Sequence, residues 1–266
     1  MLLDRGEQMI ARIPADTVVE PSPQIDAHLV TLLGRPSPEV DQYNALRYAL
    51  EEKRMSDGLH VVAITSPSVG DGKTTTSVNL AGALAHRRDA RVLLIDADLR
   101  RPSVAPLLGL AELPGRLGFV DAISDGALTL ERAVTHLPAF NLTVLPAGRL
   151  SDDPFELLRT PRVGELLQEA RRRYDFVIVD TPPVLLVPDS RILESWVDGF
   201  LLVVSANRTR RRLVAEALNL LAPGKMVGLV FNRDDRPLSN GYGYGYEAYT
   251  SDRARTGAST KASRWR

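Results

Sequence analysis

The stretch Thr65-Ser66-Pro67-Ser68-Val69-Gly70-Asp71-Gly72-Lys73-Thr74-Thr75-Thr76 organises this chain of 266 residues. The apolar run 60–64 precedes it and indicates a buried strand, and the helical pattern 77–86 follows it. A strand, a glycine-rich loop that ends in Gly-Lys-Thr and a helix are together typical of a phosphate-binding loop. Pro67 stands where the usual motif has a glycine, but the part from Gly70 onward is intact. The alternative is a turn rich in glycine and threonine that carries a surface lysine.

Each residue type in this loop suits the binding of phosphate. The glycines allow the backbone to turn tightly and to direct N–H groups at phosphate oxygens. The helix that begins near Thr74 adds the partial positive charge of its N-terminus. Lys73 can reach the outer phosphates, and the Thr74 hydroxyl can bind Mg²⁺. The candidate nucleotide-binding residues are therefore Gly70, Asp71, Gly72, Lys73, Thr74 and Thr75.

Two further strand patterns end in carboxylates. The apolar run 92–95 leads to Asp96, and Asp98 lies two positions after Asp96. The run 176–179 leads to Asp180, a pattern typical of a Walker B strand, whose Asp orients the water around the metal. Carboxylates in these places can hold Mg²⁺ through water or accept a proton from an attacking hydroxyl. The alternative is a strand that ends in a solvated charged loop, and it is weaker beside a phosphate-binding loop.

Three more polar residues follow predicted strands. We expect Arg100 and Arg101 to contact phosphate or the carboxylates of a neighbouring subunit. Asn232 lies just past the run 226–231, and its amide offers a donor and an acceptor to the adenine edge. A turn asparagine is an equally good interpretation of Asn232 from spacing alone.

Apolar and helical patterns alternate from residue 59 onward, which indicates βαβ units. Several strand patterns are apolar on both faces, as in a sheet that helices cover on each side. The sequence therefore predicts an α/β fold, a doubly wound and mostly parallel sheet with helices on both faces, with ligands at the carboxyl ends of the strands. The predicted strands are 60–65, 91–96, 141–145, 175–180, 199–205 and 226–231. The predicted helices are 74–86, 154–159, 161–173, 209–221 and one that opens at Ser37 and ends near 55–58.

Composition divides the chain into three parts. Prolines interrupt residues 1–36, which we expect to form an extended arm whose apolar patch at 29–33 docks on the core. Residues 37–233 are predicted to be the P-loop domain. Residues 234–266 are rich in glycine, serine and arginine and poor in aliphatic residues, so we expect a flexible tail.

Bulk properties exclude several classes of protein. The net charge is zero, which argues against a polyelectrolyte binder, so we expect no specific nucleic acid as a partner. The absence of cysteine excludes disulfides and thiolate zinc sites. The sequence shows neither a signal-peptide pattern nor an apolar run of membrane-spanning length. We expect a cytoplasmic protein that a partner recruits to the inner face of the membrane.

Together these motifs resemble those of the bacterial tyrosine kinases (BY-kinases) of capsule and exopolysaccharide loci, which share the P-loop ATPase fold of MinD and ParA. The resemblance rests on a tyrosine-rich tail and on Gly70-Asp71-Gly72-Lys73-Thr74-Thr75, Asp96-Ala97-Asp98-Leu99-Arg100-Arg101-Pro102-Ser103 and Asp180-Thr181-Pro182-Pro183. It implies a protein-tyrosine autokinase that uses ATP and Mg²⁺. In that role Lys73 holds the phosphates, and the metal is bound by Thr74, Asp98 and Asp180. Asp96 helps to deprotonate the incoming tyrosine or is a further metal ligand.

Four of the seven tyrosines lie close together in the predicted tail, at Tyr242, Tyr244, Tyr246 and Tyr249. The resemblance implies that this cluster accepts the phosphate. Each phosphate adds about −1.5 to −2 charges at neutral pH, so modified tails gathered in one assembly would repel each other. The alternative is a low-complexity tail without a regulatory role. A tail that leaves the sheet on the side opposite the phosphate loop cannot easily reach its own site, and on that ground we expect transfer between subunits.

Two motifs depart from those of related proteins. Ser68 stands where MinD/ParA-like ATPases carry a signature lysine, which argues against their mode of dimerisation. BY-kinases assemble rings through a Glu-x-x-Arg-x-x-Arg motif, whose places are here Asp41, Asn44 and Arg47.

The resemblance still implies a homo-oligomer, a membrane activator of the polysaccharide co-polymerase type and a cognate tyrosine phosphatase. The alternatives are a MinD/ParA-like positioning ATPase and a non-catalytic scaffold switched by ATP.

Overall fold

The computed structural model describes residues 17–18, 25–110 and 117–234. The chain divides into two units, Met1–Asn232 and Arg233–Arg266, and every helix and strand of the described residues belongs to the first. Only residues 233–234 of the second unit are described. Apart from Asp234, the predicted tail, with its four tyrosines, therefore lies outside the described residues.

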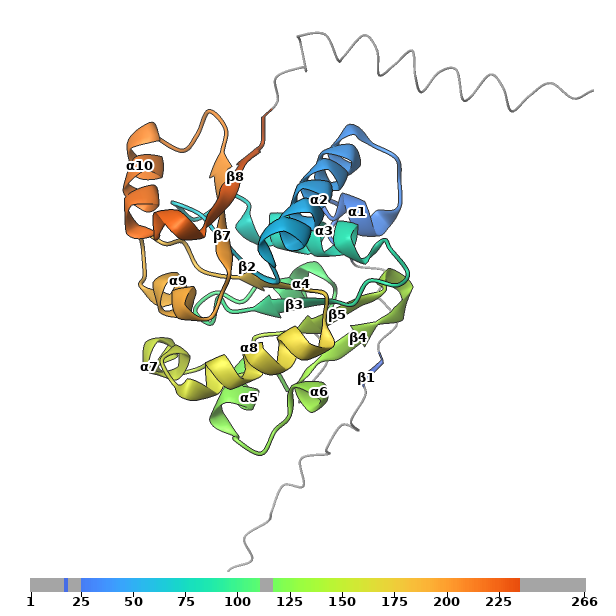
Figure 1. Ribbon diagram of the computed structural model, residues 1–266, viewed down its shortest axis with the longest axis vertical. Helices are drawn as coiled ribbons and strands as arrows, with labels where there is room; N and C mark the ends of the chain where they lie inside the picture. Colours follow the sequence, from blue (N-terminus) through green and yellow to red (C-terminus); the bar gives the residue numbers. More distant parts are fainter. Residues whose placement is uncertain (1–16, 19–24, 111–116, 235–266) are drawn as a thin grey trace, which may run out of the picture. The chain divides into compact units, whose positions relative to one another are not determined.

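An eight-stranded sheet forms the centre of the first unit (Figure 1). The strand order is β1-β4-β5-β3-β6-β2-β7-β8, and all neighbouring strands are parallel except β4 and β5. This confirms the prediction of a mostly parallel α/β sheet. The strands are β1 (Thr17–Val18), β2 (Val61–Thr65), β3 (Val92–Asp96), β4 (Thr135–Leu137), β5 (Leu142–Leu145), β6 (Phe176–Asp180), β7 (Gly199–Ser205) and β8 (Met226–Asn232).

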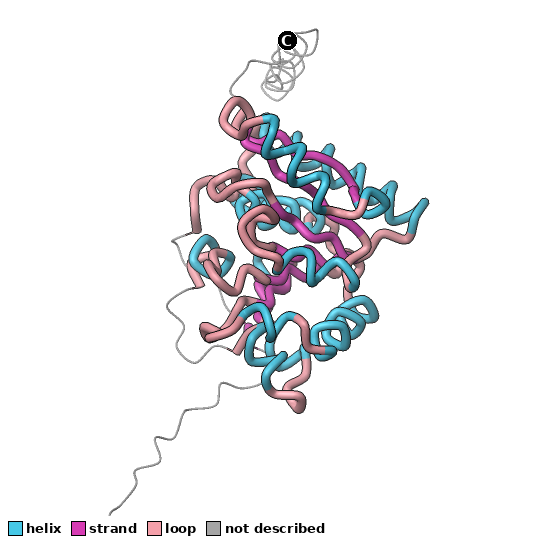
Figure 2. The backbone as a smooth tube through the Cα atoms, turned by 90° about the vertical axis from the view of Figure 1, so that its left-hand side faces the viewer, coloured by secondary structure: helices cyan, strands magenta, loops and turns pink. Residues whose placement is uncertain are grey.

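Helices cover both faces of the sheet, as Figure 2 shows with the strands running between helices. Two apolar cores result: Val61 and Ala63 of β2 belong to one core, and Val62 and Ile64 to the other. Burial on both faces explains why these strands are apolar throughout. The helices are α1 (Val30–Leu33), α2 (Pro38–Asp57), α3 (Lys73–Ala85), α4 (Val104–Leu107), α5 (Phe119–Ser124), α6 (Leu130–Ala133), α7 (Pro154–Leu158), α8 (Pro161–Arg173), α9 (Asp189–Ile192) and α10 (Arg211–Leu220), with 3₁₀ turns at Pro138–Phe140, Leu193–Ser195 and Pro223–Lys225.

The six predicted strands are present within one residue at each end, but the sequence analysis missed β1 and β4. Strand β4 has three residues and returns as β5 after a 3₁₀ turn, with the pair antiparallel. Three residues are too few to establish an alternating pattern. The sequence alone therefore cannot predict β4, which is recognised as a strand only from its antiparallel pairing with β5.

Within the extended arm predicted for 1–36, the structure describes residues 17–18 and 25–36, and part of the second range is helical. Residues 30–33 form α1, and Leu29 is fully buried, so the apolar patch docks on the core as expected. Asn79 of α3 accepts the Thr31 N–H through Oδ1 at 3.1 Å and donates through Nδ2 to the His28 carbonyl at 2.9 Å. A Cβ at Gly82 would lie 2.6 Å from the Thr31 hydroxyl, so α1 packs where α3 has no side chain.

The longest helix of the described residues is α2, with 20 residues. The Ser37 hydroxyl accepts the Val40 N–H at 3.4 Å, and Gly58 ends the helix in the left-handed conformation. Both caps agree with the predicted boundaries. Across the described ranges, no helix combines the length and the apolar character that a membrane crossing requires.

Replacing Asn79 by alanine should lower the free energy of unfolding by about 1–3 kcal/mol, because the buried Thr31 N–H and the part-buried His28 carbonyl lose their partner. Denaturant titration measures this change. Asn219→Ala, at an exposed position of α10, is the matched control and should change stability by less than about 0.5 kcal/mol. Equal stability of the two variants would show that Asn79 does not anchor the N-terminal segment.

Candidate active site

The predicted acidic strand ends lie at one edge of the sheet. Strands β2 and β3 both run parallel to β6, so the carboxyl ends of all three strands lie together. The register pairs Asp180 of β6 with Asp96 on one side and with Ile64 on the other. The phosphate-binding loop follows β2 after Thr65 and therefore begins beside Asp180, with Asp96 one strand farther along the sheet.

The loop has the backbone that its glycines were expected to allow. Gly70 has φ of 84° and Gly72 has φ of 92°, both in the left-handed region that favours glycine. Gly72 is also the N-cap of α3, so the free N–H groups of the helix begin at the end of the loop. A Cβ at Gly72 would lie 1.9 Å from Nδ2 of Asn232, so this position also requires glycine because β8 lies so close.

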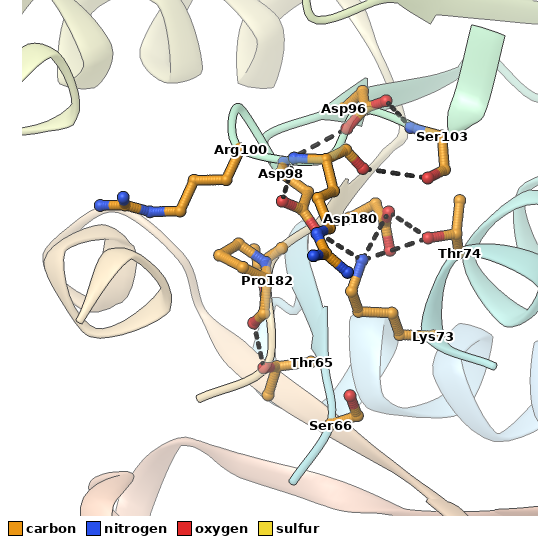
Figure 3. Close-up of polar contacts among 12 residues, drawn as sticks. Thr65, Ser66, Lys73, Thr74, Asp96, Asp98, Arg100, Ser103, Asp180 and Pro182 are labelled. Atoms are coloured by element: carbon orange, nitrogen blue, oxygen red, sulfur yellow. Dashed lines mark hydrogen bonds and ion pairs between the residues drawn. The ribbon is translucent and has the colours of Figure 1, made fainter. Parts of the chain in front are cut away.

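Lys73 lies between two of the predicted carboxylates (Figure 3). Its Nζ is 2.8 Å from Oδ2 of Asp98 and 3.4 Å from Oδ2 of Asp180. The lysine side chain is only 12% exposed. Burial opposes its charge, but the attraction of Asp180 and Asp98 outweighs burial and raises the pKa of Lys73. The lysine is therefore a fixed cation at the N-terminus of α3.

Asp180 is fully buried and accepts hydrogen bonds from two hydroxyls of α3. Thr74 donates to Oδ2 at 2.7 Å, and Ser77 donates to Oδ1 at 2.9 Å. Burial raises the pKa of Asp180, although Lys73 and the two hydroxyls act in the opposite direction. Ser77 was missed by the sequence analysis. The helical spacing could have identified it, because Ser77 lies four residues after Lys73 and so on the same face of α3.

Asp96 organises the loop that follows β3. Its Oδ2 accepts the N–H groups of Ser103 and Val104, each at 3.0 Å, and its Oδ1 accepts the N–H of Asp98 at 3.2 Å. The carboxylate is fully buried. Burial and the negative charge of Asp180 raise the pKa of Asp96 to about 7. Asp96 therefore shapes the turn that presents Asp98 to Lys73.

Oxygen atoms suited to Mg²⁺ gather around Lys73, from the Thr74 hydroxyl and the carboxylates of Asp98 and Asp180. Among the described residues, no three or more His, Cys, Asp or Glu side chains form a group that could hold a metal ion. In phosphate-transfer sites Mg²⁺ is bound by one or two carboxylates, water and the substrate phosphates rather than by a protein cage. The residues present fit a Mg²⁺ ion that binds together with a nucleotide.

Two other residues predicted to bind the nucleotide, Asp71 and Asn232, form hydrogen bonds within the protein that fix the phosphate loop. The Asp71 carboxylate accepts the Ser68 N–H at 2.9 Å and the Thr209 hydroxyl at 2.6 Å. Nδ2 of Asn232 donates to the Asp71 carbonyl at 3.0 Å. Gly70 and the backbone of Thr75 remain where the prediction placed them, at the turn and in the first turn of α3. Asp71 and Asn232 thus join the loop to the region of β7 and β8.

The chain leaves the first unit beside the phosphate loop. Strand β8 is parallel to β7 and β7 to β2, so β8 ends at the same edge as the loop, where Asn232 contacts Asp71. Asn232, the last residue of β8, therefore lies at the edge of the sheet that carries the phosphate loop and not at the opposite edge. The ten residues from Asn232 to Tyr242 can span at most about 33–36 Å. The position of Asn232 gives no steric reason for transfer between subunits, which stays a prediction.

Arg100 pairs with a carboxylate of its own chain, and its predicted contact with phosphate or a neighbouring subunit stays a prediction. Its guanidinium forms two hydrogen bonds with Asp189, from Nε at 2.8 Å and from Nη2 at 3.1 Å. Asp189 was missed because nothing in its local sequence distinguishes it from a surface carboxylate. The backbone N–H of Arg101 donates a hydrogen bond to Oδ1 of Asp98 at 3.0 Å.

The helix expected to carry ring contacts shows two different environments. Asp41 and Asn44 are exposed on α2. Arg47 pairs with Glu51 at 3.2 Å and donates to the Ala83 carbonyl at 3.2 Å. The one retained residue of the motif is thus held by contacts within the first unit.

Comparison with known proteins agrees with this geometry. Residues 59–208 match the family described as AAA domain. YwqD of Bacillus subtilis, a tyrosine-protein kinase, is 36% identical over 206 residues, which cover 77% of this chain and 85% of YwqD. CpsD of Streptococcus pneumoniae serotype 4, also named a tyrosine-protein kinase, is 31% identical, with 73% of this chain and 84% of CpsD covered. The kinase domain of the Escherichia coli tyrosine kinase ETK has a TM-score of 0.71 at 29% identity, with 80% of this chain and 83% of that chain covered.

The matched family region contains the phosphate loop and the three carboxylates that end or follow β3 and β6, those of Asp96, Asp98 and Asp180. The matches to YwqD and CpsD extend over most of both relatives, so they concern the whole domain and not the phosphate loop alone. The chain therefore belongs to the bacterial tyrosine-protein kinase family, built on the P-loop fold of an AAA domain.

Proposed function

We propose that this chain is an ATP-dependent protein-tyrosine kinase that phosphorylates its own C-terminal tyrosine cluster. The observation that carries the proposal is the Lys73 ammonium at the N-terminus of α3, 2.8 Å from Asp98 and 3.4 Å from Asp180. The names of YwqD, CpsD and ETK as tyrosine kinases support tyrosine as the acceptor. The resemblance to capsule and exopolysaccharide kinases supports a role in regulating the synthesis and export of those polymers.

The phosphate loop is the proposed nucleotide site. The backbone N–H groups of 70–75 and the N-terminus of α3 offer donors and partial positive charge to a triphosphate. Lys73 adds a full charge that the surrounding carboxylates keep protonated. Mg²⁺, bound through Thr74, Asp98 and Asp180, would neutralise charge on the outer phosphates. Phosphoryl transfer needs mainly this positioning and charge neutralisation.

In the proposed transfer, the tyrosine oxygen bonds to the γ-phosphorus while the bond from that phosphorus to the β,γ-bridging oxygen breaks, and ADP leaves. The phenol proton must pass to a base. Asp96 is the proposed acceptor, and its pKa of about 7 suits proton uptake near neutral pH. Its alternative role is that of an additional metal ligand. The proposed phosphoacceptors are Tyr242, Tyr244, Tyr246 and Tyr249.

We also propose partners for the kinase on the basis of the motif resemblance. They are a membrane activator of the polysaccharide co-polymerase type, further copies of this chain and a cognate tyrosine phosphatase. The chain would then work in the cytoplasm, at the inner face of the membrane, and would bind no specific nucleic acid.

Lys73→Met should reduce phosphotyrosine formation by about 10²-fold or more, because a preorganised cation at the transferred phosphate is lost. Quantitative phosphotyrosine detection on the purified chain after incubation with ATP and Mg²⁺ measures this. A variant with all four tail tyrosines changed to Phe is the control. It should bind ATP as well as the unmodified chain and yet carry no phosphotyrosine in the tail.

The same experiment separates the kinase from its rivals. ATP-dependent dimerisation with release of phosphate and no phosphotyrosine would instead support a positioning ATPase. Nucleotide-dependent assembly without either product would support a scaffold. Ser68 in place of the signature lysine already disfavours the positioning ATPase.

The purified chain alone should show weak kinase activity if a membrane activator completes the site. The rate of phosphotyrosine formation should rise when the cytoplasmic segment of a candidate activator is added in excess. A scrambled peptide of the same composition is the control. Full activity of the chain alone would contradict the requirement for an activator.

A further inference from the structure

The loop between β3 and α4 presents two charged side chains in different directions. Asp98 reaches Lys73, whereas Arg100 extends away from both of them, as Figure 3 shows. The Arg100 guanidinium binds the two oxygens of Asp189 separately, Nε to Oδ2 at 2.8 Å and Nη2 to Oδ1 at 3.1 Å. A two-point contact of this kind fixes orientation as well as distance.

The burial of Asp189 makes this ion pair restrictive. The Asp189 side chain has no exposed surface, whereas Arg100 is 38% exposed. A buried carboxylate that loses its cation carries a large desolvation penalty. Asp189 therefore strongly favours the one position of Arg100 that satisfies both of its oxygens.

The helix that begins at Asp189, α9, is also tied to the other two parts of the site. The Ser190 hydroxyl donates to the Pro182 carbonyl at 2.7 Å and lies 3.1 Å from the Thr181 hydroxyl, just after the strand that carries Asp180. Thr65, the last residue before the phosphate loop, also donates to the Pro182 carbonyl, at 2.9 Å. Helix α9 thus joins the loop entry to the end of β6, and Arg100 joins the Asp98 loop to both.

We propose that Arg100 and Asp189 are positioning residues that hold Asp98 against Lys73. The Asp98 carboxylate otherwise depends on a local backbone bond, from the Arg101 N–H at 3.0 Å. The Arg100–Asp189 pair adds a long-range restraint, because its two residues are 89 positions apart. The inference rests on the proposed kinase function, since it concerns the alignment of that same site.

The expected kinetic effect follows from this geometry. Neither Arg100 nor Asp189 belongs to the loop that binds phosphate, so ATP affinity should remain within about twofold when the pair is broken. The carboxylate of Asp98 would lose its alignment, and a misplacement on the order of 1 Å costs about 10²-fold in rate. We therefore expect a decrease in kcat with little change in the KM for ATP.

The test compares Arg100→Ala, Asp189→Asn and the double variant in the full chain, by phosphotyrosine formation and by ATP binding. Each single variant should lose about 10²-fold in kcat, and the double variant should lose no more than either, because residues that act through one contact are not additive. Methylguanidinium should restore Arg100→Ala but not the double variant. Arg212→Ala, which removes the exposed pair with Glu216, is the matched control and should keep the kcat of the unmodified chain.

Two results would overturn the inference. A higher Kd for ATP in Arg100→Ala, together with unmodified kinetics in Asp189→Asn, would mean that Arg100 contacts the nucleotide directly. A lower Tm with unchanged kcat in both single variants would mean that the pair only stabilises the fold. Arg100→Lys keeps the positive charge but not the two-point contact, so its kcat should fall by less than that of Arg100→Ala. If Asp189→Asn does not fold, Arg100→Lys takes its place in the test.

Failure of the proposed function gives a different result. If the unmodified chain binds ATP but makes no phosphotyrosine even with the activator segment in excess, the kinase proposal is wrong, and the positioning role that rests on it is wrong as well. If the unmodified chain is active and all variants match it, only the positioning role is wrong.

Discussion

The site depends on one positive charge placed among buried negative ones. Asp96 and Asp180 are adjacent in register and have no exposed surface, and Asp98 is 5% exposed. Burial removes these carboxylates from water, and their negative charges repel one another. Both effects disfavour the charged form, and together they raise the pKa of Asp96 to about 7. Lys73 offsets part of that cost for Asp98 and Asp180. The same ammonium is then in place for the phosphates of a nucleotide.

The parallel sheet creates this concentration of charge. Each strand of a parallel sheet delivers its carboxyl end to the same edge, so residues that follow β2, β3 and β6 must meet. Covering both faces with helices leaves that edge as the place where polar side chains can gather. Helix α3 closes the arrangement, because its N-terminus begins at Gly72 and its first turns supply Thr74 and Ser77 to Asp180.

Around this centre, polar contacts tie the loops to one another. Asp71 joins the phosphate loop to Thr209 and to Asn232, and Ser190 joins the loop entry to the end of β6. Arg100 and Asp189 extend the same network to the loop of Asp98. The network explains how short, irregular segments hold charged groups at defined distances without regular secondary structure of their own.

The sequence by itself determined six of the strands, the phosphate loop and the three carboxylates at the ends of two strands, because hydrophobic runs, glycines and terminal carboxylates are local signals. It did not determine β4, whose three residues need the antiparallel β5 beside them, or the helical form of residues 30–33, which depends on the surface of α3. Only the tertiary structure paired Arg100 with Asp189 and brought the end of β8 to the phosphate loop. Such contacts join residues many positions apart, and their distance is set by the stacking of strands rather than by any pattern along the chain.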